Sequence, residues 1–270
     1  MKNILIILIS LTFTFVSYAL KPDRVYNLTP DSLGLDYTMY LIETPDKAKI
    51  KVWFLNAHDS VDNGNTLILS YGDAGNMSYW LNQAVVLNQN GYSVVLFDYR
   101  GFGGSSDFEM NPNQLYYNEF TTDLISVIKW SKQNLSYNKL GLLSFSMGTI
   151  MSTIAAQTEQ VDFIVGEGFV FSPPAIQAKI FQLKQKEIIL PSNSDEYEHL
   201  IKKIEIPMLL YSGSKDVFTT LIESKEIVSQ KANRTLIEFA GNHLEGFSVL
   251  SKSYYGELYV AELDNFIQKI

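Results

Sequence analysis

Ser146 stands at the centre of the sequence Ser-Phe-Ser-Met-Gly, between an apolar run at 140–143 and a helix-like stretch at 149–157. A serine at the apex of a tight turn between a strand and a helix is exposed and can act as a nucleophile. The backbone of such a turn is strained, so the residues two positions away must be small. Here they are Ser144 and Gly148. Glycine is usual at both positions, so Ser144 is a departure from the pattern.

Two further residues complete the set of side chains that a serine nucleophile needs. Asp216 follows an apolar strand predicted at 207–211, and His243 follows a strand predicted at 236–240. An imidazole would take the serine proton, and a carboxylate would hold that imidazole in one tautomer. Ligands bind outside the carboxyl ends of strands in an open α/β sheet. We therefore expect Ser146, Asp216 and His243 to meet there as a catalytic triad.

The same residue types also have structural interpretations. The chain has three histidines. His58 lies in a polar stretch and His199 in an acidic helix-like segment, so both are expected at the surface. Asp216 could also cap the helix that follows it, a role that is compatible with the triad.

Two other positions could supply the acid of the triad. The strand predicted at 163–171 ends in Ser-Pro-Pro without an acid, which favours Asp216. Asp98 ends a strand predicted at 92–97, but it begins the glycine-rich run Asp-Tyr-Arg-Gly-Phe-Gly. We interpret this run as structural, with Arg100 paired to a carboxylate.

A reaction at a carbonyl also needs donors for the oxyanion. One is expected to be the Met147 N–H, at the beginning of a helix where the partial positive charge favours an anion. The second is expected from the loop that follows the strand at 66–71, and we assign it to the Asp73 N–H. The Asp73 carboxylate must then point away, because an anion aimed at the oxyanion would raise the barrier.

Four motifs along the chain, at 71–76, 98–105, 213–216 and 241–243, resemble in sequence and order those of the α/β-hydrolase superfamily. They are similar to the branch of serine hydrolases with a His-Gly-Asn-Ala-Gly-Asn loop, which 71–76 matches at four of six positions. The other three motifs are the Asp-Tyr-Arg-Gly run at 98–105, the acid turn at 213–216 and the Gly-x-His turn at 241–243. The resemblance extends from about Leu67 to the C-terminus.

This resemblance implies hydrolysis of an ester, thioester or amide through an acyl-enzyme. The residues at 71 and 73 depart from the family pattern beside the oxyanion hole, which affects the expected rate and substrate more than the reaction type. A peptidase or acyltransferase on the same triad, or a non-catalytic binding protein of the same fold, are the alternatives. No metal site and no organic cofactor is expected, since no metal-ligand spacing and no nucleotide fingerprint occurs.

The elements between the motifs predict an α/β fold. A hairpin is expected from 36–42 and 49–55, and alternating strand and helix patterns predict a mostly parallel central sheet with helices on both faces. A final helix is expected along the stripe from Tyr255 to Ile270. A small cap insertion is predicted at about 175–205. Four of its apolar residues could line an acyl pocket or could simply pack: Ile176, Ile180, Phe181 and Leu183. A small cap leaves the site open, so short or exposed acyl substrates are expected.

The 270 residues fit one domain at 20–270 after a secretory signal peptide at 1–19. Lys2, the apolar run 4–16 and Ser-Tyr-Ala at 17–19 have the order of such a signal. A secreted or periplasmic location follows, and an uncleaved membrane anchor is the alternative. The chain has no cysteine, so it has neither disulfides nor a cysteine lipid anchor. A net charge of −8 argues against nucleic-acid binding, which leaves a small-molecule acyl substrate as the expected partner.

Overall fold

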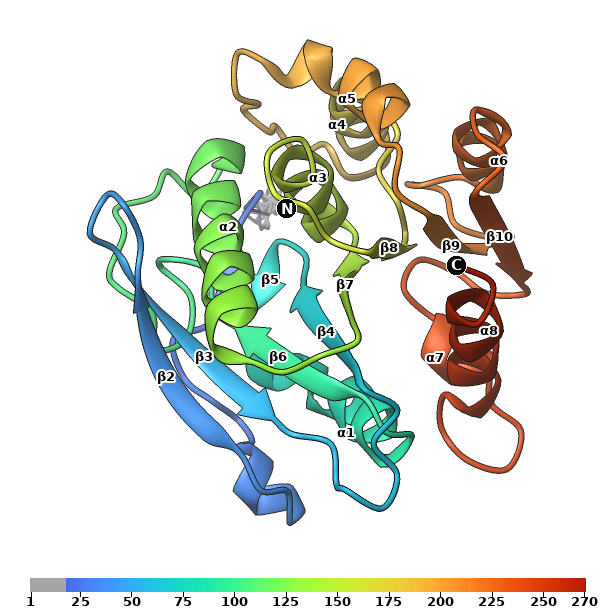
Figure 1. Ribbon diagram of the computed structural model, residues 1–270. Coiled ribbons are helices and arrows are strands. Elements are labelled where there is room, and N and C mark those ends of the chain that lie inside the picture. Colours follow the sequence, from blue (N-terminus) through green and yellow to red (C-terminus); the bar gives the residue numbers. More distant parts are fainter. Residues whose placement is uncertain (1–17) are drawn as a thin grey trace, which may run out of the picture.

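A computed structural model describes residues 18–270, so residues 1–17 of the predicted signal peptide lie outside the described residues. Its main sheet has eight strands in the order β10-β9-β8-β7-β4-β6-β3-β2, and a short pair joins β1 to β5 (Figure 1). The strands are β1 (Lys21–Pro22), β2 (Thr38–Glu43), β3 (Lys49–Leu55), β4 (Asn65–Ser70), β5 (Ala74–Gly75), β6 (Ser93–Phe97), β7 (Lys139–Phe145), β8 (Phe163–Glu167), β9 (Met208–Gly213) and β10 (Arg234–Phe239).

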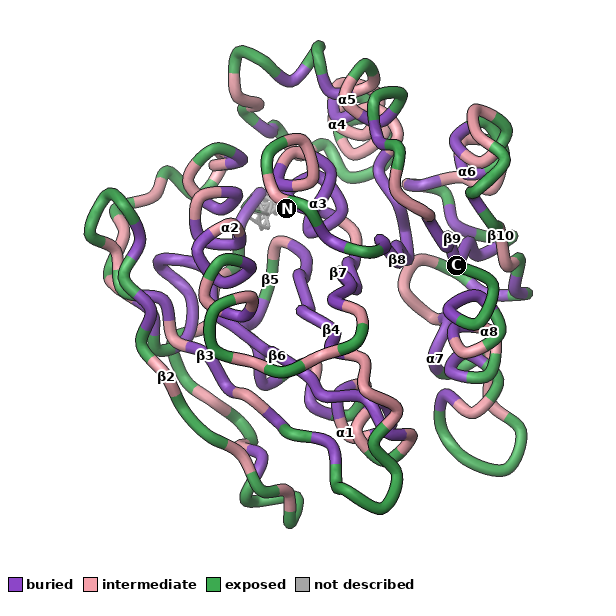
Figure 2. Tube along the Cα trace, viewed as in Figure 1, coloured by how far each residue is buried: buried purple, intermediate pink, exposed green. Residues whose placement is uncertain are grey.

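The sheet is parallel from β10 to β6, and β3 alone runs against it, because β3 pairs antiparallel with both β6 and β2. The predicted N-terminal hairpin is confirmed: β2 and β3 pair antiparallel, with Ile42 opposite Ile50. Every residue of β6 is buried, as expected for a central strand covered on both faces. The edge strand β2 exposes most of its residues (Figure 2).

Helices cover both faces of the sheet, and the α/β-hydrolase fold predicted from the sequence is confirmed. They are α1 (Leu81–Gln89), α2 (Tyr117–Asn134), α3 (Met147–Ala155), α4 (Pro173–Lys184), α5 (Tyr197–Lys203), α6 (Leu221–Ser229), α7 (Gly246–Val249) and α8 (Glu257–Ile267). Single 3-10 turns are η1 (Pro30–Leu33), η2 (Met77–Trp80) and η3 (Ser194–Glu196). Helices α2 and α3 contact each other, and α1 contacts α8.

Two predicted boundaries were wrong. The strand expected at 163–171 ends at Glu167, because Gly168 adopts a left-handed backbone conformation with φ of 62° that breaks the extended chain. The stripe expected from Tyr255 to Ile270 is longer than α8 at both ends. Tyr255 precedes a turn in which the Gly256 N–H bonds to the Phe247 carbonyl, and both end residues of the stripe are partly exposed.

The segment predicted as a small cap, at about 175–205, contains most of α4 together with η3 and α5. The chain from Ala19 to Pro22 lies beside the loop that follows β4. Ala19 and Leu20 are buried, and the Lys21 N–H donates to the Asp73 carbonyl at 2.8 Å. Between residues 18 and 270, no helix is both long enough and apolar enough to span a bilayer.

Candidate active site

The strand order places the ends of β4 and β7 side by side. Strand β6 pairs with one edge of β4, and β7 pairs with the other edge. In the β4–β7 pair, Ser70 lies opposite Ser144. Such a reversal of strand order opens a crevice at the carboxyl ends of the strands. The loop 71–76 and the turn at Ser146 therefore border the same crevice.

Ser146 occupies the strained turn between β7 and α3. Its φ of 50° and ψ of −120° are unusual for a residue with a side chain. A Cβ atom at Gly148 would lie 2.3 Å from the Ser70 carbonyl oxygen, so only glycine fits there. Ser144 is tolerated at the other flank because its buried hydroxyl lies 2.6 Å from the Ser152 hydroxyl, which gives it a hydrogen-bond partner.

The structure brings the three predicted triad side chains together. His243 Nε2 lies 2.9 Å from Ser146 Oγ, and His243 Nδ1 lies 2.7 Å from Asp216 Oδ2. Both distances are within hydrogen-bonding range. One ring nitrogen faces the serine hydroxyl and the other faces the carboxylate, which is the arrangement that a triad requires. The other histidines, His58 and His199, are exposed at the surface, as expected.

Asp216 is buried and held by the turn that follows it. The Phe218 and Thr219 N–H groups donate to Oδ1, and the Thr219 hydroxyl donates to Oδ2 at 2.6 Å. Burial alone would raise the pKa of the Asp216 carboxyl, but hydrogen bonds from His243 and Thr219 outweigh burial and lower that pKa. Asp216 does not cap helix α6, because Thr220 takes that position with Glu223 as its capping-box partner.

Glu167 is a buried acid at this site that the sequence did not predict. Its carboxylate accepts the Gly246 N–H at 2.6 Å, just after the His243 turn, and burial raises the pKa of this carboxyl to about 7. The next residue, Gly168, passes so close to the histidine that an added Cβ would lie 2.7 Å from His243 Cε1. The strand predicted at 163–171 included both residues, so Glu167 was not recognised as an acid at the end of a strand.

The oxyanion loop, residues 71–76, faces the Ser146 turn. An added Cβ at Gly72 would lie 3.6 Å from the Ser146 Cβ, so the two backbones are close. Met147 begins α3, and the first N–H groups of a helix have no acceptor within it. The Asp73 N–H donates no hydrogen bond within residues 18–270. Asp73 is one of the residues that line the pocket.

Asp98 is fully buried beneath the oxyanion loop and gathers four donors. The Tyr71 hydroxyl and the Met77 N–H donate to Oδ1 at 3.0 and 2.8 Å, and the Tyr26 hydroxyl and Gly104 N–H donate to Oδ2. Tyr71 and Met77 flank the loop, so one carboxylate fixes both of its ends. The tyrosine at the family's histidine position thus has a defined partner.

Arg100 is paired with carboxylates, as predicted. Its guanidinium donates from Nε and Nη2 to Asp123 Oδ1 at 2.9 and 2.7 Å, and it also binds Asp46. The Asp123 side chain is 0% exposed. This ion pair joins α2 to the loop after β6 and lies apart from the triad, which supports the structural interpretation of the run that begins at Asp98.

A pocket of about 150 Å³ adjoins the triad. Ser146 and His243 lie at its wall, and its remaining lining is mostly apolar, with Asp73, Lys184 and Lys186 as the charged residues. Of the four cap residues considered for an acyl pocket, Ile176 and Ile180 line it. Phe181 lines a neighbouring hollow, and Leu183 is 58% exposed to solvent. Residues 18–270 contain no cluster of acidic, histidine or cysteine side chains arranged to hold a metal ion.

Comparisons with known proteins agree with this architecture. A family model described as the alpha/beta hydrolase fold matches residues 65–175, which include the oxyanion loop and the Ser146 turn. The structure of an esterase from Pyrococcus furiosus superposes with a TM-score of 0.76 at 20% identity, over 94% of this chain and 98% of that one. The chain therefore has the α/β-hydrolase fold.

Two curated relatives match most of the chain. The uncharacterized protein YfhR of Escherichia coli strain K12 is 24% identical over 91% of this chain and 84% of its own length. The uncharacterized membrane protein YNL320W of Saccharomyces cerevisiae is 26% identical over 80% of this chain and 76% of its own length. Neither name states a reaction, so the activity must be argued from the site.

Proposed function

We propose that this α/β-hydrolase is a serine hydrolase that cleaves carboxylic esters through an acyl-enzyme. The observation that carries the proposal is the chain of contacts from Asp216 through His243 to Ser146, at 2.7 and 2.9 Å. A serine hydroxyl needs a base within hydrogen-bonding distance, and that base needs a fixed orientation. The three side chains meet both requirements.

In the first half of the reaction, Ser146 Oγ attacks the ester carbonyl carbon while His243 Nε2 takes its proton. The Asp216 carboxylate stabilises the imidazolium that forms. The negative charge on the former carbonyl oxygen is held by the Met147 N–H at the beginning of α3, with the Asp73 N–H as the second donor. The imidazolium then returns its proton to the leaving alcohol as the carbon–oxygen bond breaks.

In the second half, water attacks the acyl-enzyme and His243 again takes and returns the proton, which frees Ser146. The mostly apolar pocket favours an apolar acyl group, and its volume of about 150 Å³ favours a short one. The fold similarity to an esterase supports this reaction class without identifying the substrate. A peptidase or acyltransferase would share the first half-reaction, so a panel of ester and amide substrates with alcohol acceptors is needed to separate them.

A fluorophosphonate probe tests the proposal directly, because it reacts only with an activated serine. Labelling of the parent protein is expected, together with its loss in Ser146→Ala. The variant His243→Ala should lower ester turnover by about 10³-fold or more, as in other triads. His199 is exposed and lies outside the triad, so His199→Ala is a matched control and should keep full turnover. Equal labelling of the parent and Ser146→Ala would reject Ser146 as the nucleophile.

We also propose that the mature domain is secreted or periplasmic, on the strength of the signal-like residues 1–19. An uncleaved anchor would leave the protein in the membrane fraction instead. Cell fractionation with N-terminal sequencing of the mature chain distinguishes the two, and cleavage after Ala19 is the expected result.

A further inference from the structure

Two lysines of the cap segment line the same pocket as the nucleophile. Lys184 ends α4, and Lys186 follows it by two residues; both border the pocket with Ser146 and His243. Lys184 Nζ lies 4.7 Å from the centre of the Phe218 ring, which also lines the pocket. Neither lysine forms an ion pair within residues 18–270.

Lys186 is the more enclosed of the two and has an unfavourable charge environment. Burial lowers the pKa of its ammonium; Asp73 opposes this effect, and the nearby cations of Lys184 and Lys21 add to it. An ammonium that is partly removed from water without a close counter-ion costs free energy. A bound anion would offset that cost, and nothing in the described chain supplies one within ion-pair distance.

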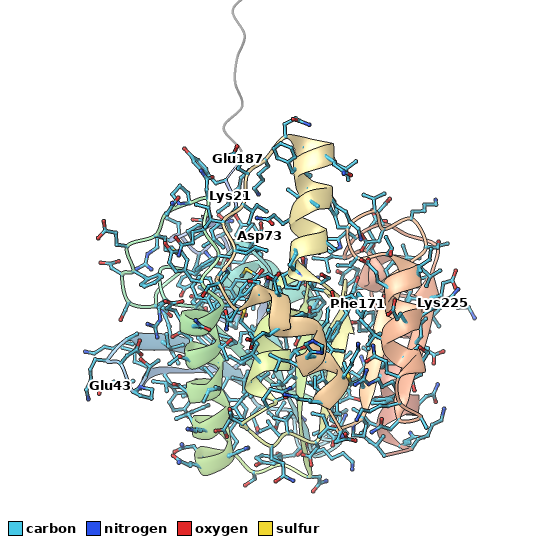
Figure 3. The ribbon with its side chains drawn as sticks, turned by 90° about the horizontal axis from the view of Figure 1, so that it is seen from above. Lys21, Glu43, Asp73, Phe171, Glu187 and Lys225 are labelled. Atoms are coloured by element: carbon cyan, nitrogen blue, oxygen red, sulfur yellow. The ribbon has the colours of Figure 1, made fainter. Side chains whose placement is uncertain are left out.

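The whole chain carries a net charge of −8, but positively charged residues outnumber negatively charged ones in the pocket lining. Asp73 lines the pocket with these lysines, and Glu187 lines the adjoining hollow with Lys186. Figure 3 places Lys21, Asp73 and Glu187 together at one end of the molecule. In the pocket lining itself, the two lysines Lys184 and Lys186 accompany the one carboxylate of Asp73, which leaves a net positive charge available to a ligand.

The inner wall of the pocket is apolar. Met147, Ile150 and Val170 line it from the core, and Ile176 and Ile180 line it from α4. An acyl group would occupy this wall, so the charged residues are left for the other part of the substrate. The pocket lining thus offers both apolar contacts and ammonium groups to a substrate.

We propose that Lys184 and Lys186 bind an anionic group on the leaving-group side of the substrate, so that the preferred substrates are esters of apolar acids with alcohols that bear a carboxylate, sulfonate or phosphate. This inference rests on the proposed esterase function and adds the substrate class. Charge-assisted hydrogen bonds from a lysine ammonium to such a group strengthen binding beyond apolar contact.

The test compares two esters that share an acyl group and a nitrophenol chromophore: 4-nitrophenyl butanoate, which is neutral, and its 3-carboxy derivative, which is anionic. The measured quantity is the ratio of kcat/KM for the anionic ester to that for the neutral one. Lys186→Met keeps the apolar stem and removes the charge, and it should lower this ratio about fivefold, with a larger loss in Lys184→Met/Lys186→Met. High salt should lower the parent ratio as well.

The matched control is Lys202→Met, since Lys202 is exposed on α5 away from the pocket. It should leave the ratio unchanged. A Lys186→Met ratio equal to that of the parent, with the neutral ester still hydrolysed, would overturn the anion-binding proposal alone. Absence of hydrolysis of both esters by the parent, together with absence of fluorophosphonate labelling, would overturn the proposed function and this inference with it.

Discussion

At the scale of single residues, the triad was predictable because each member follows a strand. Ser146, Asp216 and His243 come after β7, β9 and β10, and parallel strands bring their carboxyl ends to one edge. Glu167 was not predictable by the same rule, because the apolar residues after it extended the expected strand. The turn at Gly168 depends on a backbone angle that no apolar pattern records.

Glu167 makes the stability of the protein depend on pH. Burial raises the pKa of its carboxyl in the folded state to about 7, from an ordinary value of 4.5. The folded protein therefore binds more protons than the unfolded chain between these values. The resulting stability is fully present below pH 4.5 and is lost as the pH rises through 7, by up to about 3 kcal/mol.

Urea unfolding of the parent and of Glu167→Gln at pH 5 and pH 8 measures this contribution. The free energy of unfolding of the parent should fall more between the two pH values than that of the variant. Comparing the two proteins isolates Glu167, because other buried acids such as Asp123 titrate in both. Equal falls in both proteins would show that Glu167 is not the titrating group.

At the scale of elements, the oxyanion loop depends on contacts that lie far apart in the chain. Its ends are fixed by Asp98, and Tyr26 from the N-terminal segment reaches the same carboxylate. The two-residue strand β1 beside it carries no periodic pattern, so no local feature of the sequence predicts this pairing. The long helix α2, by contrast, was predictable from the helical spacing of Phe120, Leu124 and Val127, which are buried.

Removing the Tyr71 hydroxyl should loosen this loop. We expect Tyr71→Phe to lower kcat about tenfold with little change in KM, because the Asp73 N–H is needed mainly when the oxyanion forms. A trifluoromethyl ketone inhibitor forms a tetrahedral adduct with the serine. Its affinity for Tyr71→Phe should fall by a factor similar to the fall in kcat.

The control is Tyr92→Phe, which removes a similar hydrogen bond, from a buried tyrosine hydroxyl to Asp264, outside the site. It should lower stability without lowering kcat. An equal loss of kcat in both variants would mean that general destabilisation, and not the position of the loop, accounts for the Tyr71 effect.

At the scale of the whole molecule, the fold class followed from alternating strands and helices, whereas the ion pairs that join distant elements did not. The sequence predicted that Arg100 would pair with a carboxylate but could not name Asp123 or Asp46, because long-range contacts leave no local pattern. The pocket lining likewise combines Ala19 with cap and core residues. Only the folded chain brings these together.

Breaking the buried ion pair should destabilise the whole domain. Arg100→Met leaves the Asp123 carboxylate buried without its partner, at an expected cost of about 3–5 kcal/mol. The exposed pair between Lys47 and Glu43 provides the comparison, and Lys47→Met should leave stability nearly unchanged, because solvent screens an exposed ion pair. Thermal or urea unfolding measures both, and similar losses in the two variants would contradict the importance assigned to burial.

The place of the mature amino terminus has a practical consequence for handling the protein. With the proposed cleavage after Ala19, the mature chain begins at Leu20, next to the Lys21 contact with Asp73 of the pocket lining, so a tag attached there would obstruct diffusion of large esters. Ile270, at the other end of the chain, does not line this pocket and is 36% exposed. Immobilisation through the carboxyl terminus should therefore preserve access to the catalyst, whereas immobilisation through the amino terminus should selectively penalise bulky substrates.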